Sequence, residues 1–166
     1  MNDKILDDRE KRYLQTVELY NIYKKPIICG KINYPGQNKN TLEAEKAFSA
    51  LLFSLNTEFK EKLIFLKLLE GFDGKAVLAV IDMDPVEVKK RGVYMEENHE
   101  LGRIFDIDIY VEEEFIGREK MNKSPRRCLI CSEDARVCMR LNKHSLEEVI
   151  DSVNKLISAY GEKYED

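Results

Sequence analysis

The 166-residue chain is 43% hydrophobic and 35% charged, which is an ordinary globular composition with enough apolar material for a packed core. Its net charge of −4 and pI near 5.4 argue against general nucleic-acid binding, and no apolar run approaches the length of a membrane span. The N-terminal MNDKILDDREKR is too charged for a signal peptide, so we expect a cytoplasmic protein with reduced cysteines and a single domain over residues 1–166.

The charge is unevenly distributed along the chain. Residues 118–143 hold eight Lys or Arg against three acids, which leaves +5 in this segment and −9 elsewhere. Such a basic segment suits a phosphate-rich substrate or an acidic partner, although a solvated surface explains most charge runs.

Apolar residues at helical spacing predict a first helix over about 6–23, with its apolar positions at Leu6, Tyr13, Leu14, Val17 and Tyr20. Arg9 and Arg12 lie one turn apart on this helix and could reach a phosphate, although solvated helix arginines are commoner.

The apolar run over 26–32 predicts a short strand, and the Pro and Gly of NYPG predict a turn after it. Asn40 or Thr41 can cap the helix that follows, whose apolar face is Phe48, Leu51, Leu52, Leu55 and Phe59.

Gly36 and Lys39, next to the start of that helix, form a candidate phosphate cradle. The segment is not a Walker A motif, and a plain strand–turn–helix connection explains the same residues.

The apolar run 63–69 is ambiguous in type, whereas 76–81 reads as a strand. Asp84, which precedes Pro85, is expected to cap a helix that extends to about Glu97. Asp82 is a candidate third metal ligand. His99 is a candidate general base, although a polar histidine at a helix end is commoner.

The central stretch ELGRIFDIDIYV, residues 100–111, carries two carboxylates in a β-favouring run. Side chains alternate along a strand, so Asp106 and Asp108 should share one face while the apolar residues Phe105, Ile107, Ile109 and Val111 face a core. A solvated edge strand is the simple alternative.

Two carboxylates on a rigid strand suit Mg²⁺, which takes oxygen ligands and is usually shared with substrate phosphates. Gly102 allows close backbone approach and Arg103 supplies a fork of donors for phosphate. The chemistry indicated is phosphoryl or nucleotidyl transfer.

Residues 112–117 look like a hairpin connection, and Arg118 begins the returning segment. Consecutive strands joined in this way favour an α+β fold, a small mixed β-sheet flanked by helices, over the alternative α/β arrangement.

Cys128, Cys131, Cys138 and His144 form a C-x2-C-x6-C-x5-H pattern that is compatible with Zn²⁺. Against zinc, residues 132–140 look helical, which would place Cys131 and Cys138 two turns apart and suit plain packing. Ser145 is expected to cap a final amphipathic helix, with Glu148 three residues on.

Several motifs together resemble one known family, the phosphoribosyl-dephospho-CoA transferases of citrate lyase, also called citrate lyase holo-acyl carrier protein synthases. The motifs are HELGRIFDIDIY, PRRCLICSEDARVC with a following HS, NYPGQNK, and REKR at residues 9–12. The resemblance covers nearly the whole chain. One departure is Leu141-Asn142-Lys143 before His144, where the family leads us to expect a more basic run.

The resemblance implies a nucleotidyltransferase-like enzyme that moves the 5-triphosphoribosyl-3'-dephospho-CoA prosthetic group to a serine of the apo acyl carrier (gamma) subunit, releasing diphosphate. Asp106 and Asp108 are then the expected catalytic metal ligands, and the expected phosphate-binding residues, in one cradle, are Arg103, Lys39, Gly36, Arg118, Arg126 and Arg127. No nucleic acid or membrane is expected as a partner. The rival hypothesis is a non-catalytic, zinc-stabilised protein-binding module with a basic docking surface.

Overall fold

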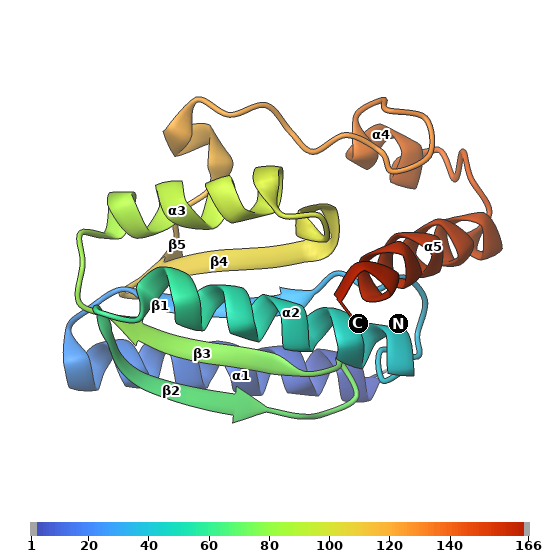
Figure 1. Cartoon of the computed structure of the whole chain (residues 1–166). Coiled ribbons are helices and arrows are strands. Elements are labelled where there is room, and N and C mark those ends of the chain that lie inside the picture. The colour runs from blue at the N-terminus through green and yellow to red at the C-terminus, as the bar shows by residue number, and fades with distance from the viewer. Residues whose placement is uncertain (1–2, 165–166) are drawn as a thin grey trace.

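A five-stranded sheet with helices on both faces is the framework of the molecule (Figure 1), in a computed structural model that describes residues 3–164. The elements, in chain order, are α1 (Asp3–Tyr23), β1 (Ile27–Ile32), α2 (Leu42–Phe59), β2 (Leu63–Leu69), β3 (Ala76–Ile81), α3 (Pro85–Asn98), the 3-10 helix η1 (Gly102–Ile104), β4 (Phe105–Val111), β5 (Glu114–Phe115), the 3-10 helix η2 (Arg118–Met121), α4 (Ala135–Arg140) and α5 (Leu146–Tyr164).

The strand order is β2-β3-β1-β4-β5, and every strand pairing in residues 3–164 is antiparallel. The predicted α+β class is therefore confirmed, and the α/β alternative, which needs parallel strands, is excluded for this part of the chain. No helix within the same range has both the length and the apolar character needed to cross a membrane.

Local capping signals place three of the helices as predicted. The Thr41 hydroxyl accepts a hydrogen bond from the backbone N–H of Ala44 at the start of α2, and the Asp84 carboxylate accepts one from Glu87 in α3. At α5, Ser145 and Glu148 each accept the other's backbone N–H, which is a capping box. These reciprocal bonds satisfy orphan N–H groups of the first helical turn.

The sheet buries two separate apolar surfaces. α1 packs on one face, where the buried cluster is Leu19, Ile27, Cys29, Leu78 and Val80. α2 and α3 cover the other face, and α5 adds Val153 and Ile157 to that larger core. Gly92 allows α3 to approach β4 closely, because a Cβ at that position would lie 3.1 Å from Cγ2 of Ile107.

The predicted apolar positions of α1 are partly wrong. Leu6 and Leu14 are 48% and 58% exposed, whereas Ile5, Thr16 and Leu19 are buried. The reason lies in the sheet beneath α1, whose surface near β4 carries charged side chains as well as apolar ones.

β4 alternates as the sequence predicts. Phe105, Ile107 and Ile109 are fully buried on the α3 side, while Asp106 and Asp108 are half-buried on the opposite face. In the register with β1, Asp106 lies opposite Lys31 and Asp108 lies opposite Cys29.

The second edge of β4 is closed by side chains instead of a strand, because β5 pairs only with Tyr110 and Val111. The backbone N–H of Ile107 donates to Oε1 of Glu96 at 2.9 Å, and the Lys89 ammonium donates to the Ile107 carbonyl at 3.2 Å. Both side chains come from α3 and are buried, so two charged groups replace a missing ladder partner.

Residues 118–145 lie outside the sheet, along the outer side of α3, and carry α4 on the way to α5 (Figure 1). Cys138 is the one buried residue in this fully described stretch. The expected helix over 132–140 is shorter than predicted, because the Asp134 carboxylate accepts the N–H of Arg136 and α4 begins only at Ala135.

Candidate active site

Asp106 and Asp108 lie on the face of β4 that α1 covers, and the two carboxylates neighbour each other. The side chain of Asp106 is 28% exposed, with one Oδ 3.5 Å from the Lys31 ammonium. Burial and the charge of Asp106 raise the pKa of Asp108 to about 6. The strand thus holds two anionic groups in mutual repulsion, which a cation between them would relieve.

A second group of charges, here called the Asp73 cluster, adjoins this pair and consists of Asp73, Arg9, Arg12, Lys31 and Lys39. Arg9 donates through Nε and Nη2 to one Asp73 oxygen at 3.1 and 3.0 Å, and Arg12 donates to the other at 2.8 Å. The Lys31 ammonium lies 3.9 Å from Asp73. The Asp73 side chain is only 2% exposed, and although burial raises its pKa, the hydrogen bonds from the two arginines outweigh burial and lower it.

Local structure explains this arrangement. Arg9 and Arg12 project from one side of α1 because they are three residues apart. Asp8, on the same helix, accepts the backbone N–H groups of Phe72 and Asp73, which fastens the 71–74 turn against α1.

Lys39 belongs to the Asp73 cluster, whereas Gly36 has a turn role. Lys39 donates to the Tyr34 carbonyl, lines a small hollow together with Asp73, and has a pKa lowered by burial and by Lys31. Gly36 adopts φ +80°, which favours glycine, and lies next to the side chain of Ile150 in α5. The structure therefore brings Lys39, but not Gly36, into a charged cluster.

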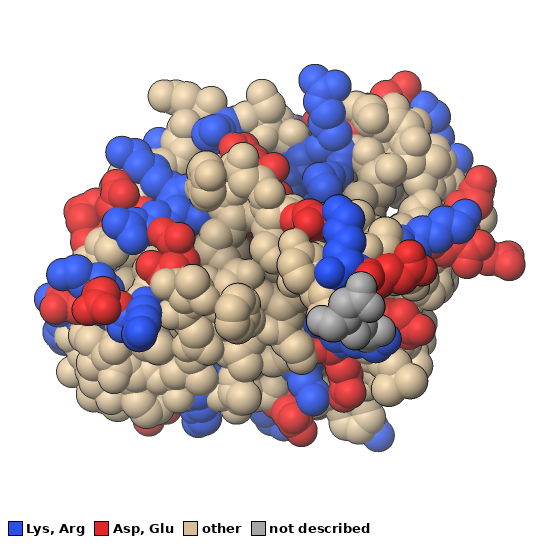
Figure 2. All heavy atoms as spheres, in the orientation of Figure 1, with Lys and Arg blue, Asp and Glu red and all other residues tan. Residues whose placement is uncertain are grey.

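A third group, here called the Glu96 cluster, lies at the edge of β4 that faces away from β1. It consists of Glu96, Arg103, Arg118 and Arg126. Glu96 is buried, with its side chain 2% exposed; it lies 2.7 Å from Nη2 of Arg118 and also pairs with Arg126. Burial and the charges of Arg126 and Arg118 lower the pKa of Arg103. Figure 2 shows basic side chains set into the hollow between the end of α3 and the segment that carries α4.

The expected single phosphate cradle is thus divided into two clusters, with Lys39 in one and three arginines in the other. Arg127 joins neither of them: it is exposed, and its guanidinium reaches the Ser132 carbonyl at 3.5 Å.

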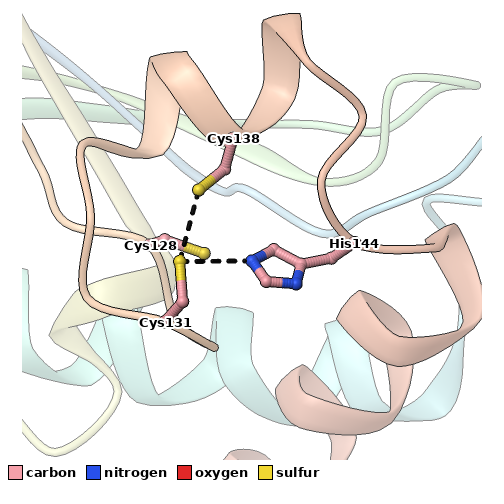
Figure 3. Close-up of side chains that lie close together, drawn as sticks. All are labelled: Cys128, Cys131, Cys138 and His144. Carbon is pink, nitrogen blue, oxygen red and sulfur yellow. Dashed lines mark hydrogen bonds between the residues drawn. The ribbon is translucent and has the colours of Figure 1, made fainter.

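The cysteine and histidine side chains of the C-terminal third converge on one point (Figure 3). The possible ligand atoms of Cys128, Cys131, Cys138 and His144 all lie within 4.8 Å of one another, so this group could hold a metal ion. The Cys131 and Cys138 sulfurs are 3.4 Å apart, and Nε2 of His144 lies 3.3 Å from the Cys131 sulfur.

The backbone around the first cysteine favours a thiolate. Burial raises the pKa of Cys128, but hydrogen bonds from the N–H groups of Cys131 and Ile130 and from the side chains of Cys138 and Cys131 lower it to about 7. Ser132 takes φ +61°, which turns the chain back after the second cysteine. Cys131 precedes α4 instead of lying on it, so packing of two cysteines along one helix does not explain the cluster.

Two other candidates have structural roles. Asp82 pairs with the Lys25 ammonium at 2.7 Å and takes no part in the Asp106–Asp108 pair. Nδ1 of His99 accepts the backbone N–H of Leu101 at 2.9 Å, and its ring packs against two aromatic rings. A histidine held in this way closes the C-terminal end of α3 and is not placed as a general base.

Sequence reasoning missed Lys31, Asp73 and Glu96 as site residues. Glu96 offered one signal, because it follows Lys89 by two helical turns on the stripe of α3 that also carries Val93. Charged residues on an apolar stripe indicate a buried polar contact. Asp73 and Lys31 offered no comparable signal.

Comparison with known families decides among the functions that these clusters allow. The model of the apo-citrate lyase phosphoribosyl-dephospho-CoA transferase family matches residues 2–160. The chain belongs to this family. The match includes β4, both charged clusters and the cysteine–histidine cluster.

Curated relatives support the same family. The chain is 28% identical over 165 residues to a probable apo-citrate lyase phosphoribosyl-dephospho-CoA transferase of Streptococcus pyogenes serotype M5, and the match covers 96% of this chain and 86% of that protein. A Vibrio cholerae protein of the same name is 25% identical over 95% of this chain and 92% of its own length. Protein CitXG of Leuconostoc mesenteroides is 29% identical over 93% of this chain, which spans only 34% of that longer protein.

Proposed function

We propose that this transferase moves the 5-triphosphoribosyl-3'-dephospho-CoA group to a serine of the apo acyl carrier (gamma) subunit of citrate lyase, with release of diphosphate, as one domain over residues 1–166. The observation that carries the proposal is the position of Asp106 and Asp108, which share a strand face between two clusters of cations. The family name supports the donor and the acceptor.

Catalysis of this reaction requires the enzyme to position the reactants and stabilise charge, and it does not require a nucleophile from the enzyme. The carrier supplies the serine hydroxyl, whose oxygen attacks the α-phosphorus of the donor while the bond to the β-phosphate oxygen breaks. Negative charge then builds up on the leaving diphosphate, and fixed cations such as Lys31 and Arg12 stabilise that charge without having to reorganise.

Asp106 and Asp108 would hold Mg²⁺, and the fit is good on three counts. Both are carboxylates, which Mg²⁺ prefers; both project from a rigid strand; and their mutual repulsion favours a divalent cation between them. An ion held by these two carboxylates would supply charge neutralisation for the triphosphate.

Cys128, Cys131, Cys138 and His144 would hold Zn²⁺. Three sulfurs and one imidazole nitrogen satisfy a tetrahedral ion completely, as in structural zinc sites, and leave no open position for chemistry. The surrounding segment has almost no core of its own, so metal binding would supply folding free energy there. We therefore assign the zinc site to the stability of the transferase.

Exchange of each aspartate for asparagine tests the proposed metal site. Asp106→Asn and Asp108→Asn should each reduce transfer of the order of 10²-fold or more, because one ligand is lost while the side-chain shape is kept. The measurement is the mass of the apo carrier after incubation with donor, enzyme and Mg²⁺.

Asp82→Asn is the matched control, since Asp82 is an exposed carboxylate that pairs with Lys25. It should retain full activity, and circular dichroism should show all three variants folded. Near-normal turnover of Asp106→Asn or Asp108→Asn would remove that residue from the site.

A further inference from the structure

Each of the two cation clusters gathers several cations around one buried carboxylate. In the Asp73 cluster four cations lie around Asp73, and Lys31 is shared with Asp106. In the Glu96 cluster three guanidinium groups lie around Glu96, and Arg118 is shared with Glu97. Each central carboxylate is only 2% exposed. A buried carboxylate fixes the cations around it, so each cluster is a pre-organised site for an anion.

One atom in the Glu96 cluster points to a missing ligand. Nε of Arg118 is buried and has no hydrogen-bond partner among the described residues, although the Nη2 of the same guanidinium contacts Glu96. An unsatisfied buried donor is costly, so a bound acceptor such as a phosphate oxygen would stabilise this arrangement.

The clusters lie on opposite sides of β4. Lys31, on the neighbouring strand β1, links the first cluster to the metal pair, because its ammonium is 3.9 Å from Asp73 and 3.5 Å from Asp106. Glu96 links the second cluster to the edge of β4 that faces away from β1, because it accepts the N–H of Ile107. Ile107 lies between the two aspartates in the sequence. A single ligand bound at the aspartates could therefore extend toward both clusters.

The donor of the proposed reaction carries two separate polyphosphate groups. The triphosphate on the added ribose bears about four negative charges at neutral pH, and the bridging diphosphate inside the dephospho-CoA part bears about two. The triphosphate must lie against the metal pair, since its α-phosphorus is the atom attacked.

We propose that the Asp73 cluster binds the diphosphate that leaves, and that the Glu96 cluster binds the bridging diphosphate of the dephospho-CoA part. This inference rests on the proposed function. The direct link through Lys31 to Asp106 assigns the leaving diphosphate, which must lie next to the metal pair, to the Asp73 cluster.

The chemical step is balanced without any further reactant. The serine oxygen forms a bond to the α-phosphorus as the bond from that phosphorus to the oxygen of the β-phosphate breaks. The electron pair of the broken bond leaves on diphosphate, and the hydroxyl proton passes to water. The Asp73 cluster receives the group whose negative charge increases, so Arg9, Arg12 and Lys31 act on the leaving group.

A purely structural role for the Asp73 cluster would be to fasten α1 to the 71–74 turn, as Asp8 does. Binding measurements separate the two roles. The probes are inorganic diphosphate with Mg²⁺ and 3'-dephospho-CoA, each titrated into the full chain and each also used as an inhibitor of transfer.

Lys31→Gln should weaken diphosphate binding at least tenfold and change the affinity for dephospho-CoA less than twofold. Arg126→Gln should produce the reverse pattern, and Lys31→Arg should restore most of the diphosphate affinity because it restores the charge. If Lys31→Gln proves unstable in urea, Lys39→Gln is the second variant, with the same expectation as Lys31→Gln.

Equal loss of both ligands in Lys31→Gln, or unchanged diphosphate affinity in Lys31→Gln and Lys39→Gln, would overturn the inference. The wild-type enzyme distinguishes this outcome from failure of the proposed function. If the wild-type protein modifies the carrier but the variants do not lose affinity for one ligand selectively, only the assignment of the two phosphate groups to the two clusters is refuted. A wild-type protein that releases no diphosphate with carrier and donor refutes the proposed function itself.

Discussion

Replacement of Glu96 by alanine is the most informative test of how the fold holds the site together. The side chain is buried, accepts the N–H of Ile107 at 2.9 Å, and neutralises Arg118 and Arg126. Glu96→Ala removes all three contacts together, while Glu96→Gln keeps an acceptor for Ile107 but removes the charge.

The magnitude follows from these contacts. A buried N–H left without a partner costs about 1–3 kcal/mol. The two guanidinium groups lose a buried counter-charge, which would cost about 3–5 kcal/mol in a dry interior, but they are 20% and 23% exposed and water screens part of the loss. We expect Glu96→Ala to lower the free energy of unfolding by about 3–5 kcal/mol in total and Glu96→Gln by about 1–2 kcal/mol.

Urea unfolding followed by circular dichroism, with zinc present in excess, measures both values. The matched control is Glu97→Gln, one residue along α3, because its side chain is 38% exposed and also contacts Arg118. It should cost less than about 1 kcal/mol. If Glu96→Ala costs no more than Glu97→Gln, the closing of the β4 edge by Glu96 does not stabilise the fold and the reasoning fails.

Three further predictions concern metal, carrier and pH. Cys138→Ser should lose zinc, measured by elemental analysis, and should make the 118–145 segment sensitive to trypsin, whereas Cys29→Ala, outside the cluster, should keep its zinc; full zinc in Cys138→Ser would contradict the site. Lys120→Glu, on the exposed surface of η2, should raise the KM for an acidic carrier at low salt with little effect on kcat, and an unchanged KM would leave this segment as a solvated surface. Burial lowers the pKa of His99, so the folded state disfavours the imidazolium and stability should be full above the unfolded value of about 6.5 and fall as the pH drops below it. His99→Gln should show a shallower fall between about pH 7 and about pH 5 in urea unfolding, and an identical pH dependence would refute that cause.

The parts of the fold that were predicted correctly depend on local signals. Thr41, Asp84 and Ser145 cap their helices because each cap needs only the next three residues. The alternation in β4 placed Asp106 and Asp108 on one face for the same reason, since the period of a strand is a local property.

The clusters around Asp73 and Glu96 were not predictable in this way. Arg9 and Asp73 are 64 residues apart, and no property of either neighbourhood indicates that they meet. The buried face of α1 was misjudged for a related reason. The sheet below it presents Lys31 and Asp106 as well as apolar groups, so α1 turns its arginines inward there while Leu14 stays exposed.

The side chains that close the β4 edge also protect the protein from association. A strand with free N–H and C=O groups is a template onto which another chain can add a strand, and natural sheets guard such edges with charge or cover. Lys89 and Glu96 occupy the hydrogen-bonding groups of Ile107, and β5 pairs with Tyr110 and Val111 farther along the same edge. Loss of either side chain would therefore expose the backbone groups of Ile107 in β4 to intermolecular pairing, and this consequence would be seen as aggregation of folded protein before any loss of secondary structure.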